Sequence, residues 1–224
     1  MPSGRSSSAA AVWAILRKEC RSEWRTRYGL NSALLFAAAT LTAVSFAVGR
    51  LGDRTDILAA LLWVVLLFAA LASLSHTFVR EVEGRTMTLL RLVASPTAIA
   101  LGKLLFNLLF LAVLEAVTVP LFLVLMGGPP LHWGRFLAVL SLGSLALAGA
   151  ATLVGAIIAQ TRGRGALFAA VSLPILLPVM AGAVSGTRGQ WNGAGVSAEL
   201  RLLAAYAAAM LGAGLLLYDH LWED

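Results

Sequence analysis

The sequence predicts an all-α integral membrane protein with six transmembrane helices. The chain of 224 residues is 59% hydrophobic and has a mean hydropathy of +0.86, which exceeds the apolar share of a soluble domain. Its apolar residues gather in runs about as long as the ~20 residues that a helix needs to cross a bilayer. The stretches between these runs are shorter than the ~50 residues of an independent domain. Residues 1–224 are therefore expected to form a single transmembrane domain.

The first 29 residues precede the apolar runs and are expected to form a tail and an interfacial helix. Residues 1–11 are rich in serine, alanine and glycine, which is typical of a loose tail. The following residues carry an apolar face at helical spacing, and arginines and Lys18 crowd the remaining surface. The apolar face consists of Trp13, Leu16, Cys20 and Trp24. This pattern predicts a basic amphipathic helix lying in the membrane interface.

The distribution of basic residues predicts the orientation of the six spans. The spans are expected at about residues 31–48, 57–78, 99–126, 136–160, 165–184 and 200–218. With the amino terminus inside, twelve Lys and Arg residues fall on the inner side and five on the outer side. This excess satisfies the positive-inside rule. Both termini and the loop before Pro96 are therefore expected to face the cytoplasm.

The stretch from Phe78 to Pro96 is the longest polar interruption between two apolar runs. Its first part, residues 80–85, holds four charges in six positions, whereas 12% of the whole chain is charged. Its second part, residues 86–94, has the spacing of a short amphipathic helix, and Pro96 is expected to end that helix. Such a helix could present a docking handle to a soluble partner, or it could be an ordinary loop helix lying on lipid headgroups.

Polar residues inside the predicted third span need partners, because hydrocarbon offers none. Lys103, Asn107, Glu115 and Thr118 fall near one stripe of this span. An ionised carboxylate at the depth of Glu115 would cost several kcal/mol unless it were paired or protonated, so Glu115 is expected to face the bundle. It could belong to a force-transmitting or substrate-facing core, or it could hydrogen-bond to a neighbouring helix.

Two further spans carry helix-packing signals. Pro174 and Pro178 remove backbone donors one turn apart and are expected to kink or break the fifth span, as a static bend or as a hinge. Small residues repeat every four positions in the fourth span, which favours close approach of another helix. They are Ser144, Ala148, Thr152 and Ala156.

The outer loops offer a few candidate features. The last loop, Ser185 to Glu199, is rich in glycine and contains Trp191, so we expect it to dip back towards the membrane surface. His132 with Trp133, and also His76 and His220, could be imagined as haem ligands. A histidine beside a tryptophan at an interface is more often an anchor.

The chain lacks the sequence motifs of several functional classes. The chain has no HExxH, GxSxG or Walker GxxxxGK[ST] pattern, so no catalytic, metal or nucleotide site is visible. Cys20 is the only cysteine, which excludes a disulfide within the chain. The net charge of +6 gathers beside apolar runs, which favours orientation in the membrane and contact with anionic lipid over nucleic-acid binding.

Three segments carry a family resemblance: KECRSEWRTRYGLN at 18–31, FVREVEGRTMTLLRLVASPTAIALGKLLFN at 78–107 and SLPILLPVMAGA at 172–183. With the order and number of spans, they make the chain resemble CcmB, the haem exporter protein B family of cytochrome c maturation. The most telling positions are Glu83, Gly84, Leu89, Leu90, Pro96 and Lys103. The tryptophan-rich WWD signature of haem-handling membrane proteins is absent, which argues against direct haem ligation by this chain.

The resemblance implies a permease of the type-2 ABC exporter class in the bacterial cytoplasmic (inner) membrane. It implies a coupling helix after the second span, re-entrant outer helices before the sixth, ATP hydrolysed by a separate subunit, CcmA, and association with CcmC, CcmD and CcmE. Haem or a haem-loaded chaperone is the implied cargo, with no covalently bound cofactor. The residues expected to couple to the ATPase are Arg80, Glu81, Glu83, Gly84, Arg85, Leu89, Leu90, Arg91 and Pro96. The alternatives are a permease for another hydrophobic cargo and a membrane scaffold that transports nothing.

Overall fold

The computed structural model describes residues 4–52, 54–83, 95–127, 132–159 and 164–220. Within these ranges the chain is helical apart from short connections, as the sequence predicts. The helices are α1 (Gly4–Thr26), α2 (Tyr28–Val48), α3 (Thr55–Glu83), α5 (Pro96–Met126), α6 (Trp133–Ala159), α7 (Arg164–Trp191) and α8 (Ser197–His220).

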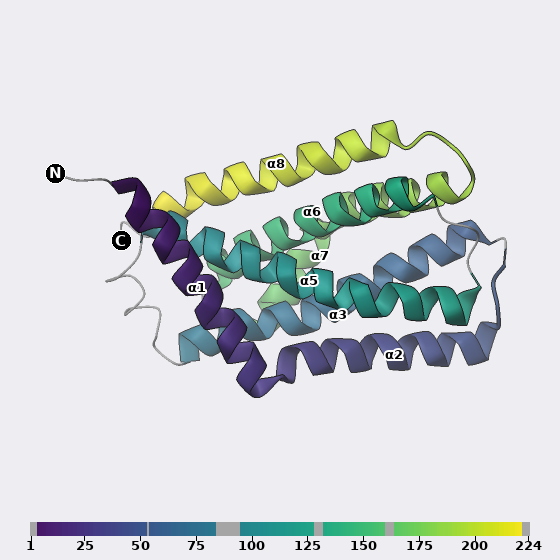
Figure 1. Cartoon of the computed structure of the whole chain (residues 1–224), viewed down its shortest axis with the longest axis horizontal. Helices are drawn as coiled ribbons and strands as arrows, with labels where there is room; N and C mark the ends of the chain where they lie inside the picture. The colour runs from purple at the N-terminus through teal and green to yellow at the C-terminus, as the bar shows by residue number, and fades with distance from the viewer. Residues whose placement is uncertain (1–3, 53, 84–94, 128–131, 160–163, 221–224) are drawn as a thin grey trace.

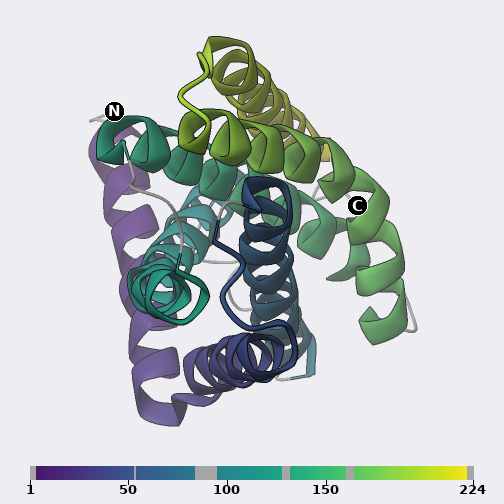
Figure 2. The same cartoon turned by 90° about the vertical axis from the view of Figure 1, so that its right-hand side faces the viewer.

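The helices after α1 run lengthwise through the molecule in alternating directions, while α1 lies across one end of them (Figure 1). The beginning of α1 and the end of α8 lie at this same end. Viewed along the bundle in Figure 2, α1 covers one side and continues at an elbow into α2. The alternation agrees with the predicted order of the spans.

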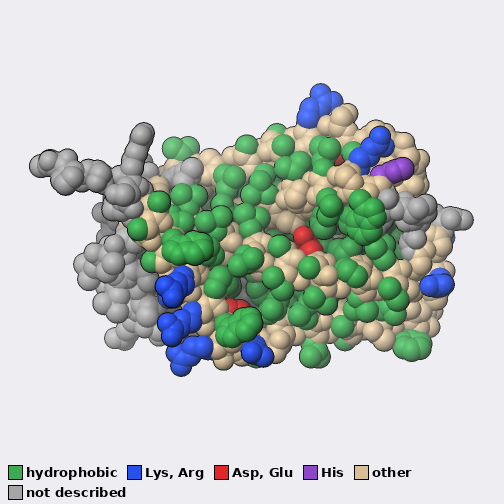
Figure 3. Space-filling model, viewed as in Figure 1, with side chains coloured by type: hydrophobic (Ala, Val, Ile, Leu, Met, Phe, Trp, Pro, Cys, Tyr) green, Lys and Arg blue, Asp and Glu red, His purple; other side chains and the backbone are tan. Residues whose placement is uncertain are grey.

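Within the described residues, three helices are long and apolar enough to cross a membrane: Tyr28–Val48, Thr97–Met126 and Trp133–Gly155. They match the predicted first, third and fourth spans within a few residues. The apolar part of α3, Thr55–Leu71, is shorter, so crossing by α3, α7 and α8 stays a prediction. Figure 3 shows a broad apolar surface along the body of the molecule with basic side chains gathered towards its ends. The chain is a multi-pass membrane protein.

The core of the bundle is built around the small-residue face of α6. Ser144, Ala148 and Thr152 are all buried, and α6 packs against α5, α7 and α8. Because these side chains are small, neighbouring backbones can approach closely. The prediction that this face is a packing surface is confirmed for these three residues.

The structure corrects the predicted tail and adds a buried stripe to the first helix. Helix α1 begins at Gly4, so residues 4–11 are helical. Its buried stripe contains Ile15 and Glu19, whereas the Trp13 and Trp24 side chains are 66% and 74% exposed. The reason is steric: Ile15 fits against the bare backbone of Gly102, where an added Cβ would lie 2.7 Å from Ile15 Cγ2. The tryptophans are thereby left at the surface of the bundle end.

Two predicted loops are shorter than expected. Helix α7 continues to Trp191 and α8 begins at Ser197, so most of the predicted loop 185–199 is helix. Burial of Trp191, which is 8% exposed, favours the longer helix over a surface loop. Helix α3 likewise continues through Glu83. Residues 80–83 are therefore helical, while the predicted short helix at residues 86–94 lies outside the described residues.

Helix α7 contains both Pro174 and Pro178 and remains one continuous helix. Both prolines are exposed on the surface of the bundle. A break in the helix is thus absent at this position. A functional hinge stays a prediction.

Candidate functional site

The candidate functional site lies at the end of the bundle where α1 crosses it and where α3 ends and α5 begins. Arg80, Glu81 and Glu83 belong to the last turns of α3. The other expected coupling residues before Ser95 lie outside the described residues: Gly84, Arg85, Leu89, Leu90 and Arg91. The described part of the site consists of the helices that flank residues 84–94.

Helix α5 has a well-formed start. Ser95 is its N-cap, and Ser95 Oγ accepts a hydrogen bond from Ala98 N at 3.3 Å. Pro96 occupies the first helical turn, where its missing N–H costs nothing and its fixed φ suits the helix. The cap and the proline together define where α5 begins.

A buried ion pair holds α5 against α1. Lys103 Nζ lies 3.6 Å from Glu19 Oε1, and the two side chains are only 2% and 6% exposed. Lys18 Nζ lies 3.3 Å from the same oxygen. The pair reinforces the contact of Ile15 with Gly102, which lies one helical turn away on α1 and one residue away on α5. Sequence reasoning found Lys103 and missed Glu19; the signal was a carboxylate among the arginines of an otherwise basic helix.

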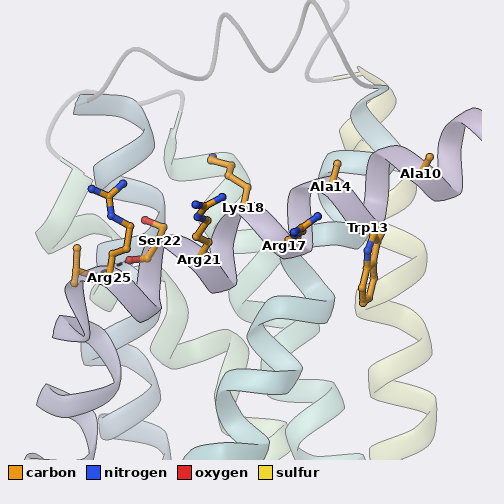
Figure 4. A pocket seen from close by; sticks show the side chains of 9 residues that line it. Ala10, Trp13, Ala14, Arg17, Lys18, Arg21, Ser22 and Arg25 are labelled. Atoms are coloured by element: carbon orange, nitrogen blue, oxygen red, sulfur yellow. Dashed lines mark hydrogen bonds between the residues drawn. The ribbon is translucent and has the colours of Figure 1, made fainter.

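The outward face of α1 is basic and hollowed. A pocket of about 900 Å³ runs along it, and its described lining residues are Ala10, Trp13, Ala14, Arg17, Lys18, Arg21, Ser22, Arg25 and Thr26. In Figure 4 the labelled basic side chains of this face extend away from the helices beneath α1, whereas Trp13 points back along the bundle. This face can bind an acidic surface, while Trp13 is placed for the apolar side of the interface.

Two buried polar contacts join α5 to α6. The Ser144 hydroxyl donates to Glu115 Oε1, and Asn107 Nδ2 donates to Thr152 Oγ1 at 2.9 Å. Glu115 is 7% exposed, so the expectation that it faces the bundle is confirmed. Its observed partner is a neighbouring helix, which favours the hydrogen-bonding role over a substrate-facing one.

The comparison with known proteins decides the family. A family model described as CcmB protein matches residues 10–216. The chain belongs to the CcmB family. It is similar to the Heme exporter protein B of Paracoccus denitrificans, with 30% identity over 88% of this chain and 92% of the relative. It is also similar to those of Rhodobacter capsulatus, 27% identical over 88% and 91%, and Pseudomonas aeruginosa, 29% identical over 88% and 89%.

In this CcmB chain, the opposite end of the bundle is closed by aromatic side chains that sequence reasoning did not connect. The Trp191 ring stacks with Phe122 and with Phe136, at 6.5 Å between centroids in each case. Trp63 Nε1 donates to Thr187 Oγ1 at 2.9 Å, which ties α3 to α7. Glycine-rich sequence around Trp191 suggested a loop, whereas the glycines allow α7 to pack closely.

Haem ligation by the predicted histidines stays a prediction for this CcmB chain, because His132 is the one candidate whose side chain is described. His132 is exposed, and its backbone N donates to Gln190 Oε1 at 3.3 Å. The side chains of His76 and His220 are not among those described. No cluster of three His, Cys, Asp or Glu side chains suited to a metal ion occurs among the described residues.

Proposed function

We propose that this chain is the permease subunit of an ABC transporter complex that acts in haem export and cytochrome c maturation. Family membership and the relatives' name, Heme exporter protein B, support this function. The observation in the structure that carries it is the junction of α1 and α5 directly after residues 84–94. An ATPase that moves this segment would move two helices together.

The structure suggests how force would be transmitted. The ATPase, expected to be CcmA, docks where α3 ends, at Arg80, Glu81 and Glu83, and on the following segment. Movement passes through Ser95 and Pro96 into α5, and the Lys103–Glu19 pair carries α1 with it. The α5–α6 contacts then extend the movement into the bundle.

The proposed orientation places the α1 end of the bundle on the cytoplasmic side of a bacterial inner membrane, where ATP is available. The basic face of α1 supports it, because basic residues are retained on the inner side. CcmC, CcmD and CcmE are the expected further partners. The transported species is haem itself or a haem-loaded chaperone released by the cycle.

The docking proposal is tested by charge reversal at the expected contact. The variant Glu81→Lys, Glu83→Lys, Arg91→Glu is compared with a control that reverses two exposed charges at the opposite end, Arg54→Glu and Arg135→Glu. We expect only the first variant to lose co-purifying ATPase and haem-stained c-type cytochromes. Normal ATPase recovery and cytochrome yield in that variant would contradict the docking site.

A further inference from the structure

An amphipathic groove lies at the elbow between α1 and α2, on the membrane side of α1, where α5 forms its inner wall. It has a volume of about 430 Å³, within the range of small-molecule sites of ~300–1,000 Å³. Its lining residues are Cys20, Glu23, Trp24, Arg27, Leu30, Asn31, Phe106, Leu109, Phe110 and Val113. It is separate from the basic pocket on the outward face of α1.

The groove changes character along its length. Its described polar residues lie between Cys20 and Asn31, at the end of α1 and the start of α2. Its described α5 residues, from Phe106 to Val113, are all apolar. These seven steps along α5 span about 10 Å at ~1.5 Å per residue. Leu109 and Val113 are 49% and 38% exposed, so the wall faces the lipid side. A ligand that fits this gradient has a polar head at the elbow and a hydrocarbon chain along α5.

The polar end of the groove favours an anionic head. Arg27 adopts the left-handed backbone conformation, with φ of 51°, and its guanidinium carbon lies 5.2 Å from the Trp24 ring centroid. The Glu23 carboxylate is engaged as a cap, because Glu23 Oε1 accepts from Leu30 N at 2.8 Å. Arg27 is the basic residue among the described lining of the groove, and Arg25 lies two residues before it on α1.

We propose that this groove binds one anionic phospholipid, with its phosphate at Arg27 and one acyl chain along Phe106 to Val113. Cationic side chains near the surface attract anionic lipids, and Trp24 has the amphipathic ring of an interfacial anchor. The groove suits a single chain better than a transmembrane helix, which is about 10–12 Å across. The bound lipid fills the angle between α1 and the bundle.

The test uses native mass spectrometry of the full-length chain released from nanodiscs that contain phosphatidylglycerol or phosphatidylcholine. We expect retained phosphatidylglycerol to exceed phosphatidylcholine by about fivefold, the contribution of about one basic residue. Arg27→Gln removes this preference. Val113→Trp fills the apolar end and abolishes retention, whereas Val117→Trp, on an exposed α5 position that does not line the groove, leaves retention unchanged.

Cys20 supplies a second readout, because it is the only cysteine and lines the groove. Phosphatidylglycerol should slow its alkylation by N-ethylmaleimide in the parent chain and in Val117→Trp, but not in Arg27→Gln. Equal retention of both lipids, or loss of retention in both tryptophan variants, would overturn the proposal. It would also be overturned if Val113→Trp released a co-purifying polypeptide, or if haemin displaced the lipid at equimolar amount.

Discussion

Lys103 and Glu19 show what a single buried contact contributes to the junction of α1 and α5. Both side chains are almost fully buried, and their attraction offsets the cost of removing two charges from water only while both are present. Lys18 also approaches Glu19, so loss of the carboxylate affects two cations, whereas loss of Lys103 leaves Glu19 in contact with Lys18. Loss of Glu19 is therefore expected to cost more stability than loss of Lys103.

Glu19→Gln is expected to lower the free energy of unfolding by roughly 3–5 kcal/mol, because it removes one partner of a buried ion pair. Lys103→Met should cost less, since Glu19 keeps Lys18. The double variant should recover most of the loss. Unfolding in detergent, followed by circular dichroism, measures all three; equal losses for the two single variants would refute the asymmetry.

The Cys20 thiol should react unusually slowly near neutral pH. Burial, with a smaller contribution from Glu19, raises the pKa of Cys20 above its ordinary value. The thiolate is the reactive form, so its fraction at a given pH is lower than in an unfolded chain. We expect the alkylation rate to keep rising with pH beyond the point where the rate for the chain in sodium dodecyl sulfate levels off. Coincident pH profiles would contradict this shift.

At the scale of helices, the contact of α3 with α6 depends on the absence of a side chain at Gly143. A Cβ there would overlap Trp63 Cη2 and lie 3.0 Å from Cζ3. Trp63 is fully buried and hydrogen-bonded to Thr187 on α7, so it has little room to move. The three helices therefore meet around one indole ring.

Gly143→Ala is expected to destabilise the bundle by about 1–3 kcal/mol, the usual cost of overpacking a core. The matched control is Gly134→Ala, on the same helix, where nothing lies within 4 Å of an added Cβ. Alanine there should be neutral or slightly stabilising, because it favours helix more than glycine does. Thermal unfolding in detergent compares the two, and equal melting temperatures would exclude a tight contact at Trp63.

The boundaries of α2, α5 and α6 could be predicted from the sequence because long apolar runs define them and their ends coincide with changes in composition. The ends of α3 and α7 could not, because both helices continue into polar or glycine-rich sequence that forms loops elsewhere. The candidate site was predicted in part: hydropathy identified Lys103 and Glu115 as needing partners. It could not identify Glu19 or Ser144, because that choice depends on which helices become neighbours.

At the scale of the whole molecule, the alternation of helix directions brings the start of α1 and the end of α8 to one end (Figure 1). Basic residues of α1 lie at this end, and the positive-inside rule predicts that it faces the cytoplasm. The helix order thus predicts that both termini lie on the same side of the membrane, and the charge pattern predicts that this side is the cytoplasmic one.

Protease-cleavable tags placed at both termini should behave identically. We expect both to be cut in inverted membrane vesicles and protected in vesicles with the native orientation. Cutting of the two tags from opposite sides would contradict the helix order. Cutting of both only in natively oriented vesicles would preserve the fold and overturn the assigned orientation.

The position of Trp63 makes α3 resemble a lever with an off-centre pivot. From Trp63 the helix extends twenty residues, about 30 Å, to Glu83, but only eight residues, about 12 Å, to Thr55. A sideways movement at the Glu83 end of a rigid rod therefore arrives at Thr55 reversed and reduced to about two-fifths. Thr55 Oγ1 lies 3.0 Å from Asn192 Oδ1 in the link between α7 and α8. A rigid α3 that turned about Trp63 would therefore convert a large displacement of Glu83 into a small, opposed displacement of Thr55.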